Sequence, residues 1–201
     1  FGRPYIKDAS KFALCIGHCD DIHVDGALFD TRSDGFHGYG PMRRAKFGTF
    51  TGTTGDDTFS LTISDYTSQT TNLTNNGETT TLGDFEDIDI DCLQIENDVI
   101  PTGGSTKGSG FAILGNSASY KVRRLNIGSI LGRSKQAVRI TNDANLTATY
   151  VEDVTIGKIA CNKGSVSSQV YLAPTSMDTL TIGDIAGTDT AASILVEVNS
   201  G

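Results

Sequence analysis

Two polar turns in the first third of the chain carry aspartates that could perform acid/base chemistry. Asp34 lies two residues before Phe36. Asp57, which follows Asp56, lies two residues before Phe59. If the two phenylalanines occupy equivalent positions in consecutive coils of a solenoid, Asp34 and Asp57 lie one strand spacing apart, about 4.8 Å from backbone to backbone. Carboxyl groups in such an arrangement could cleave a glycosidic bond.

This chemistry requires carboxyl groups in different protonation states. One must stay protonated to donate to the leaving oxygen, and a like charge beside it raises its pKa. Another must be ionised to activate water, with the two carboxyls roughly 6.5–9.5 Å apart for inversion. Asp is also common in turns because its side chain binds nearby backbone groups, so a structural role for these residues stays open.

Repeated short segments must position these turns. Six segments share an apolar–polar–apolar pattern, and four of them continue with Gly, one polar residue and an apolar residue. Their first apolar residues are 23, 43, 37, 29 and 26 residues apart. The short intervals match one turn of a solenoid, and the long intervals require loop insertions. These anchor residues are Ile22, Ala45, Ile88, Leu125, Val154 and Leu180.

A second strand-like run precedes each anchor, and a seventh run ends the chain. Each repeat is therefore strand, turn, strand and connection, with little room for a helix, and it can bury its apolar face only by stacking on its neighbours. We expect an all-β protein, a single-stranded parallel β-helix of about seven coils, forming one domain over residues 1–201. The predicted runs are Phe12–Ile16, Phe36–Gly38, Thr58–Ile63, Phe111–Leu114, Ala137–Ile140, Val170–Leu172 and Ile194–Val196.

An antiparallel sandwich of short strands is the alternative fold. The dipeptides Asp25-Gly26 and Asp34-Gly35 are favourable hairpin turns and keep that alternative open. Three polar stretches, residues 65–83, 97–109 and 142–150, are expected to be exposed insertions.

Composition limits the function classes. The formal net charge of −8 and the pI near 4.7 argue against nucleic-acid binding, which needs a basic face. No apolar run approaches 18 residues, so we expect no transmembrane helix. The chain has no charged-then-apolar leader, and we expect it to be a fragment of a longer protein. We expect its four cysteines to be reduced, which fits assembly inside a cell.

Side chains alternate between the two faces of a strand, and this alternation assigns inward and outward positions in the runs that precede the anchors. The outward residues line up along one face in a parallel stack, so Asp34 and Asp57 would share a groove with several of them. We expect the inward residues to be Phe36, Phe59, Leu61, Phe111, Ile113, Val138, Ile140, Val170 and Leu172. We expect the outward residues to be His37, Thr58, Ser60, Ala112, Arg139 and Tyr171.

Four short motifs appear in an order that resembles the polygalacturonase-type glycoside hydrolases. In that family the motifs are Asn-Thr-Asp, Gly-Asp-Asp, Gly-His-Gly and Arg-Ile-Lys, on successive coils of a right-handed β-helix. The resemblance implies that Asp34, Asp56 and Asp57 supply the acid and the water-activating base of an inverting hydrolysis. The matching segments are residues 31–36, 55–57, 107–113 and 138–141.

The chain departs from the family at two positions. Ser109 stands where the family has His, and Thr141 stands where it has Lys. Because the cationic Lys of the family is missing, the resemblance implies neither a uronate substrate nor full catalysis. We expect no cofactor, and the expected substrate-binding residues are His37, Ser60, Ser109, Arg139 and Tyr171.

The Gly/Thr/Asp-rich repeats, long polar insertions and scarce Pro also resemble the β-helices of bacteriophage tailspike and tail-fibre proteins. That resemblance implies a homotrimer in the virion tail, acting outside the host cell on its surface polysaccharide, with no nucleic acid and no membrane insertion. The alternatives are a non-catalytic glycan-binding or structural β-helix of a virion appendage, or a surface adhesin.

Two metal sites were considered and set aside. Cys15, His18, Cys19 and His23 could ligate zinc, but a solenoid corner explains them more simply. An acidic run could attract calcium, but its members follow the outward period of a strand and not the spacing of a calcium loop. That run is Asp84, Glu86, Asp87, Asp89 and Asp91.

Overall fold

The computed structural model describes residues 2–62, 83–96, 108–115, 119–142, 149–163, 168–186 and 194–198. Within these ranges every regular element is a β-strand, and every strand pairing is parallel. The prediction of an all-β parallel fold is confirmed, and the antiparallel sandwich is wrong. The three predicted insertions lie largely outside the described residues. The described part contains no helix long and apolar enough to cross a membrane.

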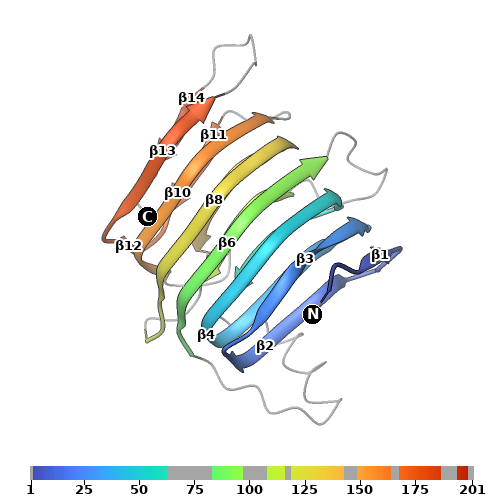
Figure 1. Ribbon diagram of the computed structural model, residues 1–201. Coiled ribbons are helices and arrows are strands. Elements are labelled where there is room, and N and C mark those ends of the chain that lie inside the picture. The colour runs from blue at the N-terminus through green and yellow to red at the C-terminus, as the bar shows by residue number, and fades with distance from the viewer. Residues whose placement is uncertain are drawn as a thin grey trace.

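The chain passes alternately through two ladders of one curved sheet, and one pass through both is called a rung below (Figure 1). The two are called ladder A and ladder B, and Figure 1 shows the strands of ladder B side by side, from β3 (His23–Asp30) to β13 (Leu180–Ala186). Ladder A consists of β2 (Phe12–Asp20), the first part of β4 (Asp34–Thr53), β5 (Phe59–Thr62), β7 (Ser109–Gly115), β9 (Gln136–Asn142), β11 (Ser168–Ala173) and β14 (Ile194–Val198). Ladder B consists of β3 (His23–Asp30), the rest of β4, β6 (Phe85–Glu96), β8 (Val122–Ser134), β10 (Tyr150–Lys163) and β13 (Leu180–Ala186). Two short strands, β1 (Tyr5–Lys7) and β12 (Ser176–Met177), pair with β3 and β10.

The predicted repeat register is confirmed in ladder B. Ala45 pairs with Ile88, and the same column continues through Leu125, Val154 and Leu180. Ile22 begins this column, because its carbonyl oxygen accepts a hydrogen bond from Lys46 N at 2.8 Å. Each predicted run of ladder A lies within or overlaps an observed strand. One difference is that β4 runs without a break through both ladders, where separate strands were expected.

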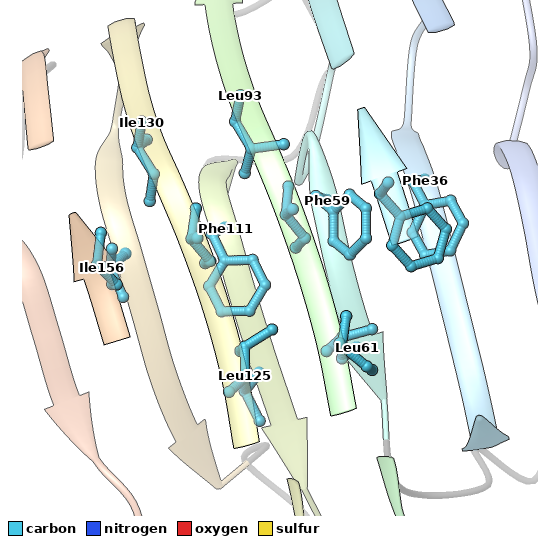
Figure 2. Close-up of a cluster of buried hydrophobic side chains, with 14 of the residues drawn as sticks. Phe36, Phe59, Leu61, Leu93, Phe111, Leu125, Ile130 and Ile156 are labelled. Atoms are coloured by element: carbon cyan, nitrogen blue, oxygen red, sulfur yellow. The ribbon is translucent and has the colours of Figure 1, made fainter. Parts of the chain in front are cut away.

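Aromatic rings fill the space between the ladders in the second and third rungs. Phe36 stacks on Phe59 of the next rung with ring centroids 4.2 Å apart. Phe47 and Phe50 of ladder B meet these rings edge-on, at 4.9 Å from Phe36 and 5.4 Å from Phe59 respectively. Figure 2 shows how the column continues through Phe111 and how aliphatic residues of ladder B face it. All nine residues that were expected to face inward are buried.

Alternation fails at one column of ladder A, and this failure positions the site. A Cβ atom on Gly35 would lie 2.5 Å from the ring of Phe29, so this position faces the interior directly before Phe36. Its register partner Thr58 is fully buried, and its hydroxyl lies 3.2 Å from that of Thr54. The expectation that Thr58 faces outward is therefore wrong. Because two consecutive residues face inward, the preceding Asp34 turns to the outer side of the sheet, where it meets His37.

Replacing Phe59 with Ala should destabilise the protein by about 3–5 kcal/mol, because the change empties a site enclosed by aromatic rings of two rungs and both ladders. Thr155→Ala, on the exposed face of β10, should change the free energy of unfolding by less than about 0.5 kcal/mol. Denaturant titration of both variants measures these values. A loss below about 1 kcal/mol for Phe59→Ala would contradict this account of the core.

Candidate functional site

The outer side of ladder A contains a buried polar cluster formed by two adjacent rungs. His37 Nδ1 lies 2.7 Å from Asp34 Oδ2 and 2.9 Å from Ser60 Oγ. The Ser60 hydroxyl lies within donating distance of Asp34 Oδ2, at 3.3 Å. These three residues are called the Asp34 cluster. All three are at most 6% exposed, so the cluster is held inside the protein although it lies on the outer side of the strands.

The repeat register brings the cluster together. Phe36 pairs with Phe59 and His37 pairs with Ser60 across β4 and β5. The backbone N–H of Gly35 donates to the carbonyl oxygen of Asp57 at 2.9 Å. Asp34 and Asp57 therefore occupy equivalent positions in adjacent rungs, as the alignment of the two phenylalanines predicts.

The His37 ring is enclosed on the side away from Asp34. Its centroid lies 4.1 Å from that of Phe12 and 4.7 Å from that of Tyr39. Nε2 is buried and has no hydrogen-bond partner in the described structure. In a nucleophilic triad the serine and the carboxylate bind opposite nitrogens of the imidazole, whereas here both bind Nδ1. The Asp34 cluster is therefore not a Ser-His-Asp triad.

Burial favours an uncharged Asp34 cluster. Loss of solvation, with the charge of Asp56 as a second cause, raises the pKa of Asp34 from 3.8 to about 8. Loss of solvation lowers the pKa of His37 from 6.5 to about 3, against the opposing influence of Asp56. Asp34 is therefore largely protonated and His37 neutral near pH 7.

Asp57 lies next to the cluster and is also buried. Its Oδ1 accepts a hydrogen bond from the backbone N–H of Ser109 in the next rung, at 2.7 Å. Burial raises the pKa of Asp57 well above its ordinary value, and the charges of Asp34 and Asp56 raise it further. The Ser109 N–H and the charge of Arg139 act in the opposite direction.

The remaining predicted site residues lie nearer to solvent. Asp56, Arg139 and Tyr171 are half-buried, and Arg139 pairs with Tyr171 across β9 and β11. Asp56 influences the pKa of both Asp34 and Asp57, so the three aspartates lie within electrostatic reach of one another.

Three sequence-predicted residues have environments that differ from the ones expected for sugar contacts. His37 is 2% exposed and Ser60 is fully buried, so both side chains hold Asp34 and do not face solvent. Ser109 is also fully buried and supplies its backbone N–H to Asp57. The sequence reasoning missed Phe12, which covers His37. Its position at the start of a strand, in register with Asp34, was the available signal.

The residues named above as possible metal ligands have other environments in the structure. In the described part of the chain, no group of three or more His, Cys, Asp or Glu is arranged to hold a metal ion. Asp84, Glu86 and Asp87, considered above for calcium, form ion pairs with Arg123 and Arg124. In the described structure the four cysteines, Cys15, Cys19, Cys92 and Cys161, form no disulfide bond.

Comparison of the chain with known proteins gives no match to a family model, a curated protein or a solved structure.

Stability should fall as the pH rises from about 6.5 to about 8. The raised pKa of Asp34 stabilises the folded state fully below pH 3.8, and this contribution is lost as the pH rises to about 8. The lowered pKa of His37 contributes stability above pH 6.5 that is lost toward pH 3, so the two slopes cancel between about 4 and 6.5. Above 6.5 only the loss from the carboxyl groups remains, because Asp57 acts in the same direction as Asp34.

Asp34→Asn isolates this effect, because it keeps the size of the side chain and cannot ionise. Between pH 6.5 and 8.0 the unmodified protein should lose about 1–2 kcal/mol more than this variant, as measured by denaturant titration at both pH values. Equal losses in the two proteins would show that Asp34 does not keep its proton in the folded state.

Proposed function

We propose that the chain is a right-handed parallel β-helix of about seven coils and that the outer side of ladder A hydrolyses glycosidic bonds. The observation that carries the proposal is the half-buried carboxyl of Asp56 beside the buried carboxyl of Asp57, whose pKa is raised. An acid that keeps its proton and a neighbouring carboxylate that reaches water are the two groups that glycoside hydrolysis requires.

Asp57 is the proposed general acid. Burial raises the pKa of its carboxyl group well above the ordinary value, which favours the protonated form, and the N–H of Ser109 binds Oδ1. The other oxygen then carries the proton that is donated to the leaving oxygen of the sugar. A carboxylic acid is best suited to this role when its pKa is raised toward the working pH, and burial shifts the pKa of Asp57 in that direction.

Asp56 is the proposed base. Its side chain reaches solvent, so it can accept a proton from the water that attacks the sugar. Asp34 is a positioning residue in this scheme, because His37 and Ser60 hold it in one place beside Asp57.

Arg139 and Tyr171 are the proposed sugar contacts. They lie side by side on neighbouring rungs of ladder A, half-buried, beyond the carboxyl groups. The charge of Arg139 acts on Asp57, so the sugar contacts begin within reach of the acid. The proposed substrate is an elongated host surface polysaccharide, and the proposed setting is a homotrimeric tailspike of a bacteriophage, acting from the virion tail. Both rest on the sequence resemblance.

A non-catalytic β-helix that binds glycan or forms a structural shaft is the second candidate, and one observation favours it. Asp34 and Asp57 are only 6% and 4% exposed. In that case the buried hydrogen bonds of the Asp34 cluster fasten the second rung to the third, and no proton is transferred.

Incubation of the protein with capsular and lipopolysaccharide fractions from a panel of bacteria tests these candidates. We expect new reducing ends with at least one fraction, and a loss of about 10²–10⁴ in rate for Asp57→Asn, because it removes the general acid. Asp184→Asn, on the exposed face of β13, should retain the rate and is the matched control. Binding without cleavage by the unmodified protein would favour a non-catalytic glycan-binding β-helix. A result of neither binding nor cleavage would contradict both glycan functions and would favour the structural shaft.

A further inference from the structure

A double column of charged residues runs along the stack where each rung enters ladder B. In each of the first five rungs the two adjacent residues have the same sign, and the sign alternates from one rung to the next, whereas the sixth rung carries Asp178 and the uncharged Thr179 at these positions. Register places each pair beside the pairs of the neighbouring rungs. This charge ladder consists of Asp20 and Asp21, Arg43 and Arg44, Glu86 and Asp87, Arg123 and Arg124, and Glu152 and Asp153.

Ion pairs join the first rung to the second in this ladder. Arg43 Nη2 lies 2.8 Å from Asp20 Oδ2, and Arg44 Nε lies 2.7 Å from Asp21 Oδ1. Arg44 also lies 3.4 Å from Asp20, so a third ion pair connects the two. The hydrogen bond from Arg44 is the largest cause of the lowered pKa of Asp21.

The third and fourth rungs are joined in the same way. Arg124 lies 2.8 Å from Glu86 and 2.6 Å from Asp87, and Arg123 lies 2.9 Å from Glu86. The contact with the fifth rung is made through Lys121, which pairs with Glu152. The pKa of Asp87 is lowered mainly by its hydrogen bond from Arg124 and also by the charge of Arg44, so the second and third rungs act on each other as well.

The backbone at these positions does not favour the residues found there. The second residue of each pair has φ between 52° and 57°, in the left-handed region that disfavours residues other than Gly, Asn and Asp. Arg44 and Arg124 are the least favourable of the five. Backbone conformation alone therefore does not explain the alternation of Asp and Arg, and an interaction between side chains is needed.

In the anchor segments of the third to fifth rungs, the apolar residues differ little from one rung to the next. Each of these segments has an aliphatic anchor residue followed two positions later by Ile. These pairs are Ile88 and Ile90, Leu125 and Ile127, and Val154 and Ile156. A stack that left out one rung would bury similar columns, because each anchor fits equally well on several others.

We propose that the charge ladder determines which rung stacks on which. In the native order each charged pair of the first five rungs lies beside pairs of opposite sign, and Asp178 of the sixth rung lies beside a residue of its own sign, Glu152. A rung that stacked on its second neighbour would instead meet a pair of its own sign, one strand spacing away. Each exposed ion pair stabilises the fold little, but the difference between attraction and repulsion selects the native order.

Charge reversal in the third rung tests this proposal. Glu86→Arg with Asp87→Arg creates three consecutive cationic rungs. An exposed ion pair changes the folding equilibrium by a factor of about two, so the loss of three pairs and their replacement by repulsion should lower the folding equilibrium constant about tenfold at low salt. We also expect a lower yield of native protein on refolding from denaturant.

Three matched measurements separate this role from a local role in the turn. Adding Arg123→Glu and Arg124→Glu to the reversal variant restores the pairs of the third and fourth rungs and should recover most of the loss. Raising NaCl to 1 M should reduce the defect of the reversal variant, because the screening length falls to about 3 Å. Asp89→Arg with Asp91→Arg, on exposed positions of the same strand, changes the net charge equally and should have little effect.

A purely local role in the turn predicts different results. Arginine already occupies the left-handed position in two rungs, so the reversal variant would fold as well as the control variant. Glu86→Gln with Asp87→Asn would then be neutral or stabilising, since Asn tolerates that conformation, whereas the charge ladder predicts a loss. Equal stability of the reversal and control variants at low salt, or no recovery in the four-residue variant, would overturn the proposal.

Discussion

The apolar side of each rung can be buried only against other rungs and the opposite ladder, and the rest of the structure depends on this constraint. No single repeat encloses its own interior, so the stack of Phe36 on Phe59 and its contacts with Phe47 and Phe50 join separate passes of the chain. Once these rings are aligned, the position of every outward residue follows from the strand spacing. The Asp34 cluster and the charge ladder are both results of that alignment.

The repeat can be predicted from the sequence because apolar and polar residues alternate in the same way in each repeat. Ala45, Ile88 and Leu125 pair as their sequence context predicts, and the equivalence of Asp34 and Asp57 follows from the same register. Alternation does not show where it fails, so the inward position of Thr58 was missed. Alternation also predicts only the side of the strand on which a residue lies, and not whether another part of the chain covers that side. The burial of His37 under Phe12, and with it the raised pKa of Asp34, depends on what covers that side.

The protein uses polar residues in two opposite electrostatic environments. In the Asp34 cluster, loss of solvation makes a charge costly, so the carboxyl group retains its proton and the imidazole stays neutral. In the charge ladder, solvent keeps both signs ionised, and arginine side chains bind the carboxylates of the preceding rung. The first arrangement can place a proton donor at neutral pH. The second gives each rung a sign that its neighbours can distinguish.

The alternating sign of the charge ladder gives the stack a parity. Loss of one internal rung would bring two like-charged pairs together, such as Arg43 and Arg44 against Arg123 and Arg124. Loss of two adjacent rungs would leave the alternation intact. Duplication of a single rung would have the same effect, since the copy would lie beside a rung whose charged pair has the same sign. In evolution, such a stack would lengthen or shorten most easily by two rungs at a time, so that the functional repeat is a pair of rungs and the structural repeat is one.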